Sequence, residues 1–344
     1  MSSTRHVGIR DVARAAGVSV TTVSHALNDK PGVSDATRAN VARVAADLGY
    51  QPDPRGRQLS SGRSGLVALT VSVPDGMAKP VAELGHNASV INGIAAAVTA
   101  RELALVIVPS GGGEIWRRLS IDGAIVVDPA PGDPALDEMT SADIPVVTIG
   151  RPVGPEPLLV PALVVDNDYE HGTRVMLDHL VDRGATTVGI MSAGAGQSYE
   201  VDSIAAYRAW TKERGAQPLV DELPIVAGDE LSISIARAVA DRLDRGDLPD
   251  AIHCVEELVA SSLLTHCKAR GIRVPDDLLV SSISDRGMAE TTSPTLTTLE
   301  LHPRNLGAAA AVGLADLLDG VVAGAGTVTI PTTVVVRGST TPSS

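Results

Sequence analysis

Aromatic residues are almost absent from this sequence, and long apolar runs are missing altogether. The 344 residues include two Trp, four Tyr and no Phe. The core must therefore be aliphatic, and stacking of a ligand on aromatic side chains cannot be the main binding device. No stretch reaches 18 consecutive apolar residues, which argues against a transmembrane helix. Residues 1–14 are polar and charged where a secretory signal would need an apolar segment, so we expect a cytoplasmic protein.

Cysteine is also scarce. Cys254 and Cys267 are too few for a disulfide framework or a cysteine zinc site, so we expect two buried, reduced thiols. The glycines at 111–113 and at 194 and 196 match no dinucleotide or phosphate fingerprint. The sequence therefore predicts neither a cofactor nor a bound metal.

Charge is distributed unevenly along the chain. The formal net charge is −13. Residues 1–63 carry nine Lys and Arg against five Asp, a net +4, while the other 19 basic and 36 acidic residues give −17. A basic segment joined to an acidic body indicates that only the N-terminal part meets a polyanion.

The first 50 residues have the pattern of three short helices. Apolar positions in 10–16 share one helical face, and Gly17 is suited to end that helix. Ser19 is placed to cap a second helix that runs to about Leu27, and Ser34 to cap a third that runs to about residue 48. Two helices joined by a short turn with glycine form a helix-turn-helix arrangement.

Residues 51–64 are polar, basic and rich in Pro and Gly, which is typical of a linker. Asp53 followed by Pro54 could still begin a short helix there.

From residue 66 onward, apolar runs alternate with helical patterns. We expect about nine strands, at 66–73, 103–108, 123–127, 145–149, 163–165, 187–191, 223–226, 251–255 and 278–283. The intervening helical patterns cover 88–101, 171–183, 203–214, 232–245 and 258–270. This alternation predicts parallel sheets with helices on both faces, and the number of strands fits two sheets better than one.

Motifs along most of the chain resemble the lactose/galactose repressor (LacI) family. In the N-terminal part they are Ile9-Arg-Asp-Val-Ala-Arg-Ala-Ala-Gly-Val-Ser, Thr22-Val-Ser-His-Ala-Leu-Asn, Val33-Ser-Asp-Ala-Thr-Arg and Leu48-Gly-Tyr-Gln-Pro. In the body they are Val165-Asp-Asn with Glu170 and Gly172, Gly271-Ile-Arg-Val-Pro-Asp-Asp and Ser293-Pro-Thr-Leu-Thr-Thr. The segment Thr21–His25 is especially similar to the reading helix of the purine repressors of that family.

The resemblance implies that the second helix enters the major groove of double-stranded DNA. Matching positions give Val20, Thr21 and His25 as base readers: an apolar contact, a hydroxyl, and an imidazole that can donate to a purine N7. The short polar side chains expected at phosphates are Ser19, Thr22, Ser24 and Asn28. Two alternatives remain open, namely that His25 is a solvated surface residue and that Ser19 is only a helix cap.

By the same resemblance, the linker is a hinge helix that enters the minor groove. Leu59 stands at the position of the apolar wedge that opens a base step, and Arg55 and Arg57 would contact phosphates or groove edges. Gly56 stands where the family usually has Ala, so we expect this helix to form only on DNA. The alternative for Leu59 is a minor apolar contact within a flexible linker.

The body resembles two-lobed periplasmic binding proteins, whose ligands lie between the lobes. The positions that match effector-binding positions of the family are Asp166, Ser203, Glu256, Glu257 and Asp285. Several depart from the family pattern, because Glu256-Glu257 replaces Asn-Asp and Ser203 replaces an Arg. A sugar, polyol or nucleoside-like effector is the expected class, and the acidic side chains could instead cap helices.

These observations together predict a DNA-binding transcriptional repressor that acts as a homodimer on a palindromic operator and responds to a small-molecule effector. We expect a helix-turn-helix domain at 1–50, a hinge at 51–64 and an α/β effector domain at 65–338. One lobe would comprise 65–162 and 291–322, and the other 163–290 and 323–338. An unregulated binding protein and an enzyme are the alternatives. The first would need export, and no nucleophile–base or metal-ligand spacing supports the second.

Overall fold

The computed structural model divides the chain into two compact units, Met1–Ser64 and Gly65–Ser344, which are considered separately. The structure describes residues 7–27, 30–50, 63–72, 85–109, 115, 118–154, 162–194, 196–226, 230–283, 287–321 and 326–341.

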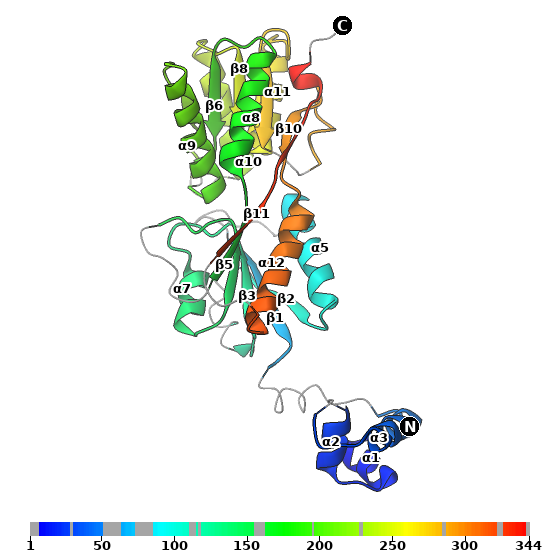
Figure 1. The fold of residues 1–344 in the computed structure, drawn as a ribbon. Helices are drawn as coiled ribbons and strands as arrows, with labels where there is room; N and C mark the ends of the chain where they lie inside the picture. The colour runs from blue at the N-terminus through cyan, green and yellow to red at the C-terminus, as the bar shows by residue number, and fades with distance from the viewer. Residues whose placement is uncertain are drawn as a thin grey trace. The chain divides into compact units, whose positions relative to one another are not determined.

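The described residues of the first unit form three short helices, as predicted (Figure 1). They are α1 (Ile9–Ala16), α2 (Val20–Leu27) and α3 (Asp35–Asp47). Gly17 ends α1 at a φ of 68°, in the left-handed region that favours glycine. Ser34 caps α3 by accepting a hydrogen bond from the Thr37 N–H. The three helices enclose a small core of buried Val and Ala residues.

The second unit contains two six-stranded sheets, one in each lobe. The first sheet has the order β11-β5-β4-β3-β1-β2 and the second the order β12-β10-β9-β8-β6-β7. The strands are β1 (Leu66–Val71), β2 (Ala104–Ile107), β3 (Gly123–Val127), β4 (Val146–Ile149), β5 (Ala162–Asn167), β6 (Val188–Ser192), β7 (Val220–Glu222), β8 (Ala251–Cys254), β9 (Leu279–Ile283), β10 (Thr297–Glu300), β11 (Gly326–Ile330) and β12 (Thr333–Val335). Neighbouring strands are parallel, except that β12 runs antiparallel to β10. The predicted two-lobed α/β body is confirmed.

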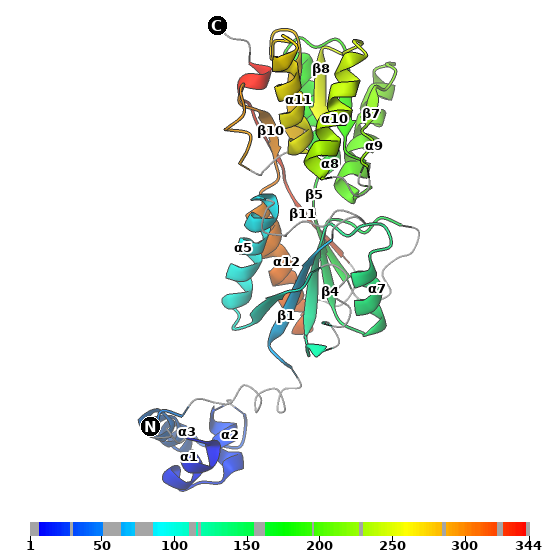
Figure 2. The ribbon, with the colours of Figure 1, turned by 180° about the vertical axis from the view of Figure 1, so that it is seen from behind.

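Helices cover both faces of each sheet (Figure 1 and Figure 2). Buried residues of α5 and α12 share a core with one face of the first sheet, and those of α7 with the other. In the second lobe, α10 and α11 cover one face, while α8 and α9 cover the other. The helices are α5 (Gly85–Thr99), α7 (Pro134–Ser141), α8 (Tyr169–Asp182), α9 (Ser198–Glu213), α10 (Leu231–Asp244), α11 (Glu257–Ala269) and α12 (Pro303–Leu318).

Two sequence-based assignments in the body are wrong. The strand expected at 223–226 lies at Val220–Glu222, where an edge strand tolerates the polar residues that hide it in the sequence. The lobe boundaries expected at 163, 291 and 323 are also misplaced. Strands β5 and β11 complete the first sheet and β10 belongs to the second, so the described chain crosses between lobes after β5, after β10 and after β11. An apolar run does not reveal which of two sheets it will join.

Cys254 and Cys267 are buried free thiols, as expected, and burial raises the pKa of Cys267 to about 11. Among the described residues, no helix has both the length and the apolar character needed to cross a membrane.

Candidate nucleic-acid interface and interlobe pocket

Helix α2 presents two different faces. Val23 and Ala26 are buried against α1 and α3, while Val20 is 41% exposed and Thr21 is exposed beside it. His25 is half-buried one turn further along. Since residues at these spacings lie away from the buried stripe, the three predicted base readers share the outer side of one short helix.

The predicted phosphate-binding residues begin at the N-terminus of the same helix. Ser19 Oγ accepts a hydrogen bond from the Thr22 N–H at 3.0 Å and lies 2.8 Å from Thr22 Oγ1. Ser19 is therefore a helix cap, and its exposed position keeps it accessible as well. Ser24 is half-buried on α2. Asn28, Arg55, Arg57 and Leu59 lie outside the described residues.

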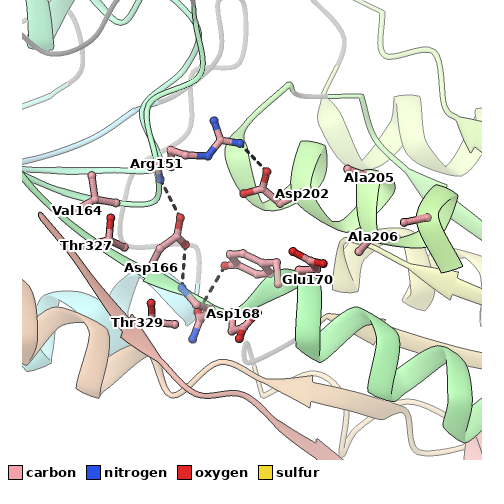
Figure 3. A pocket seen from close by; sticks show the side chains of 13 residues that line it. Arg151, Val164, Asp166, Asp168, Glu170, Asp202, Ala205, Ala206, Thr327 and Thr329 are labelled. Carbon is pink, nitrogen blue, oxygen red and sulfur yellow. Dashed lines mark hydrogen bonds and ion pairs between the residues drawn. The ribbon is translucent and has the colours of Figure 1, made fainter.

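A pocket of about 630 Å³ lies between the two lobes of the body (Figure 3). The first lobe contributes Arg151, which follows β4, together with strands β5 and β11, and the second contributes the start of α8 and one face of α9. The charged residues that line it are Arg151, Asp166, Asp168, Glu170 and Asp202. Four carboxylates thus surround one guanidinium, which makes the pocket acidic.

Asp166 is the most deeply placed of these carboxylates, at 9% exposure. Its Oδ2 accepts from the Arg151 N–H at 2.9 Å and its Oδ1 from the Asn167 N–H at 2.8 Å. Burial raises the pKa of Asp166 to about 6, and the two backbone hydrogen bonds oppose that rise. Asp168, rather than Asp166, caps α8 by accepting from the His171 N–H.

Two polar contacts connect the lobes beside this pocket. Arg151 Nη2 lies 2.5 Å from Asp202 Oδ1, so an ion pair joins the end of β4 to α9 (Figure 3). Gln197 Nε2 donates to the Asp128 carbonyl at 2.7 Å. Sequence reasoning missed Arg151 and Asp202. The one available signal was that Arg151 follows the apolar run 145–149 after a single glycine, Gly150.

The other predicted effector residues lie elsewhere in the second lobe. Ser203 is fully buried and donates to the Tyr199 carbonyl within its own helix. Glu256 Oε2 accepts from the Ala193 N–H at 3.0 Å. Glu257 is 1% exposed, and neither of its carboxylate oxygens has a hydrogen-bond partner. None of the three lines the pocket that contains Asp166, and Asp285 lies outside the described residues.

Glu200 is a further buried carboxylate that the sequence did not suggest. It accepts hydrogen bonds from the Gly194 N–H at 2.8 Å, from the Gly196 N–H at 2.5 Å and from the Ser192 hydroxyl. These contacts hold Gly194 and Gly196, which follow β6, against the start of α9. Sequence spacing could not identify Glu200, because the two glycine amides come close to the start of α9 only in the folded chain.

Comparisons with known proteins agree with this arrangement. The family model for bacterial regulatory proteins of the lacI family matches residues 8–53, and the model for the periplasmic binding protein-like domain matches residues 177–340. The HTH-type transcriptional regulator CelR of Thermobifida fusca is 29% identical over 93% of this chain and 94% of its own length. The HTH-type transcriptional repressor PurR of Photobacterium profundum is 28% identical, with coverage of 87% and 88%.

Solved structures show the same fold. A complex of the transcriptional regulator CelR with cellobiose has a TM-score of 0.71 at 25% identity, covering 97% of this chain and 99% of that one. The lac repressor dimer bound to operator and the anti-inducer ONPF has a TM-score of 0.76 at 21% identity, with coverage of 98% and 99%. A helix-turn-helix unit followed by a two-lobed ligand-binding body defines a ligand-responsive class of DNA-binding proteins. This chain combines a helix-turn-helix domain of the lacI family with a periplasmic binding protein-like domain and is a transcriptional regulator.

Proposed function

We propose that the protein is a repressor that acts as a homodimer in the cytoplasm and binds a palindromic operator. Two copies of α2, one from each protomer, enter the major groove at two half-sites related by the two-fold axis. A small molecule held between the lobes controls the affinity for DNA. The proposal includes no catalytic step, in keeping with relatives whose names describe transcriptional regulators.

The outer face of α2 carries this proposal. Val20 and Thr21 stand exposed at the start of a helix whose other face is buried in the unit. Such a short helix places its N-terminal residues at base edges while the capped turn around Ser19 meets the backbone. Val20 suits a thymine methyl group, Thr21 can donate or accept, and His25 can donate to a purine N7. A set without a bidentate Arg or Gln should discriminate each base by about 1 kcal/mol, near the lower end of the usual range.

We place the hinge at residues 51–64 and the effector domain at about 65–338. In this proposal Leu59 opens a base step at the centre of the operator, while Arg55, Arg57 and Asn28 contact phosphates or groove edges. Bending DNA in this way costs about 1–6 kcal/mol, which the additional contacts offset.

The effector site of the proposal lies between the lobes. Asp166 supplies a buried carboxylate, and the charged and hydroxyl side chains around it suit a sugar, a polyol or a nucleoside-like molecule that donates hydrogen bonds. Glu256, Glu257, Ser203 and Asp285 stay predicted contributions of the second lobe, although the first three do not line the pocket around Asp166. An effector that favours one angle between the lobes changes DNA affinity by the coupling free energy, typically about 1–3 kcal/mol.

A fluorescence-anisotropy titration of the full chain with labelled genomic fragments tests the DNA-binding part. We expect a subset of fragments to bind selectively, with an affinity that falls steeply as salt is raised. Equal affinity for all fragments would overturn operator recognition. A thermal-shift screen of sugars, polyols and nucleosides then tests the effector, because a ligand of the native state raises the apparent stability. If the protein binds DNA selectively but no compound raises its unfolding temperature, the DNA-binding part of the proposal stands and the effector part fails.

A further inference from the structure

Helix α3 holds the C-terminal end of α2 through one side chain. Arg38 Nη1 donates to the Ala26 carbonyl at 3.0 Å and lies 3.4 Å from the His25 carbonyl. Its Nη2 donates to the Lys30 carbonyl at 3.2 Å. One guanidinium on α3 therefore reaches carbonyls at the end of α2 and in the segment that follows it.

This end of α2 needs such a partner. The last carbonyls of a helix have no N–H partner within the helix, and α2 has no glycine at its end to satisfy them in a tight turn. The Lys30 N–H reaches the His25 carbonyl at 3.0 Å, and Arg38 provides the side-chain contacts. A cation at this end also interacts favourably with the negative pole of the helix dipole.

The opposite end of α2 is held by different residues. There Ser19 accepts from the Thr22 N–H, and that contact lies in the turn that begins the helix. Thr21 therefore belongs to the end held by Ser19, whereas His25 belongs to the end held by Arg38. The two ends of an eight-residue helix are thus fixed by separate contacts.

We propose that Arg38 is a positioning residue for base reading by His25: it orients the end of α2 that carries the imidazole and does not itself need to contact DNA. This inference rests on the proposed reading role of His25. It goes beyond that role because it assigns a specificity-determining residue on a helix outside the groove. Only one end of α2 depends on Arg38, so base reading by Thr21 should be largely independent of this residue.

Two alternative roles of Arg38 predict different results. If Arg38 binds a phosphate, lysine at this position keeps the charge and most of the affinity, and removal of the charge lowers the salt slope by about one contact. If Arg38 only stabilises the fold, a variant that remains folded at the assay temperature binds operator normally. If Arg38 positions the end of α2, lysine cannot replace the planar guanidinium that reaches two carbonyls at once. Arg38→Lys then loses affinity for the operator although it keeps the charge.

A double-mutant cycle on the full chain separates these readings. The DNA is a duplex selected by the wild-type protein from a randomised pool, and the variants are Arg38→Lys, His25→Ala, Thr21→Ala and the two doubles with Arg38→Lys. Arg43→Lys is the matched control, because Arg43 lies on the same helix and contacts Asp47 and Asn40 rather than α2. Circular dichroism and non-specific DNA binding verify the fold. If Arg38→Lys does not fold, Arg38→Gln, which keeps one amide donor, takes its place.

We expect Arg38→Lys to weaken binding to the selected duplex about tenfold, as loss of a charged hydrogen bond would, with an unchanged salt slope and unchanged non-specific binding. Adding His25→Ala should then cost less than about twofold more, whereas Thr21→Ala should retain its full effect. Independent, multiplying effects of Arg38→Lys and His25→Ala would overturn the positioning role, as would full rescue by lysine. If His25→Ala alone has no effect, the proposed reading role of His25 fails, and the inference fails with it.

Discussion

The helical unit and the α/β body are held together by different means. Among the described residues of the unit, seven form the buried core, and all of them are Val or Ala: Val12, Ala13, Val23, Ala26, Val41, Val44 and Ala45. The body has four larger clusters: all four contain Leu, three contain Ile, three contain Met, and one also contains Tyr and Trp. A unit of this size buries little apolar surface, so polar contacts such as those of Ser34 and Arg38 contribute a larger share of its order.

The two units also differ in charge. Basic residues are in excess before residue 64, and acidic residues are in strong excess after it. This difference favours contact of the first unit, and not of the body, with a polyanion.

The largest effect should come from the contact between α5 and α12. A Cβ on Gly307 would clash with the Val90 carbonyl, and one on Gly93 with the Arg304 carbonyl. We expect Gly307→Val to lower the free energy of unfolding of the body by about 3 kcal/mol, because backbone cannot move aside cheaply. Thermal unfolding measures the change. Val312→Leu, an exposed position on the same helix, should leave the midpoint unchanged. Equal behaviour of the two variants would show that the helices are not in this close contact.

A matched core truncation should harm the small unit more than the body. Val23 and Val147 are both fully buried, and truncation of either to Ala should cost about 2 kcal/mol. Hydrogen exchange should show that Val23→Ala unfolds the helical unit, and anisotropy that it abolishes DNA binding. Val147→Ala should leave the body folded, since its stability margin is larger. Equal loss of DNA binding in the two variants would remove the distinction between the units.

The body should carry a pH dependence that originates in the interlobe pocket. Because burial raises the pKa of Asp166 to about 6, the native state holds this proton more tightly than the unfolded state does. The stability that the protonated Asp166 side chain contributes to the native state is fully present below the ordinary pKa near 3.8. It is lost as the pH rises through about 6. We therefore expect Asp166→Asn to gain about 2 kcal/mol relative to wild type between pH 4 and pH 7.5, measured by urea unfolding. A constant difference across that range would contradict the buried, ionising carboxyl.

The smallest effect should come from the ion pair between the lobes. The side chains of Arg151 and Asp202 are 46% and 33% exposed, so their coupling should be about 0.5 kcal/mol. A double-mutant cycle with Arg151→Ala and Asp202→Ala, followed by urea unfolding, measures that coupling. It should fall further in 1 M salt, where screening is strong. A coupling of several kcal/mol would mean that the pair is much less solvated than its exposure indicates.

The same contrast explains how much could be predicted from the sequence. The helical unit was predictable because its signals are local: Gly17 ends one helix, Ser34 begins another, and apolar spacing marks the buried faces. In the body the alternation of strands and helices was visible, yet α7, α12 and the last three strands were not predicted. Strand β11 is exposed along most of its length and has no buried apolar pattern to reveal it.

The interlobe pocket was only partly predictable. Asp166 was identified through a motif, but its neighbours Arg151 and Asp202 come from other elements of the chain. Arg151 reaches Asp166 because β4 and β5 are adjacent in the sheet, and Asp202 joins them because α9 of the other lobe faces that edge. Strand order and lobe contacts are long-range properties, and no local spacing encodes them.

The most direct test of the account is selection from a randomised DNA pool by the full-length wild-type chain and by its Thr21→Ala/His25→Ala variant. The account predicts that the wild type enriches a two-fold symmetric sequence. The variant should keep salt-sensitive, non-specific binding and lose its preference at a symmetric set of positions in both half-sites. Enrichment of the same sequence with the same affinity by both proteins would contradict the assignment of α2 as the reading helix.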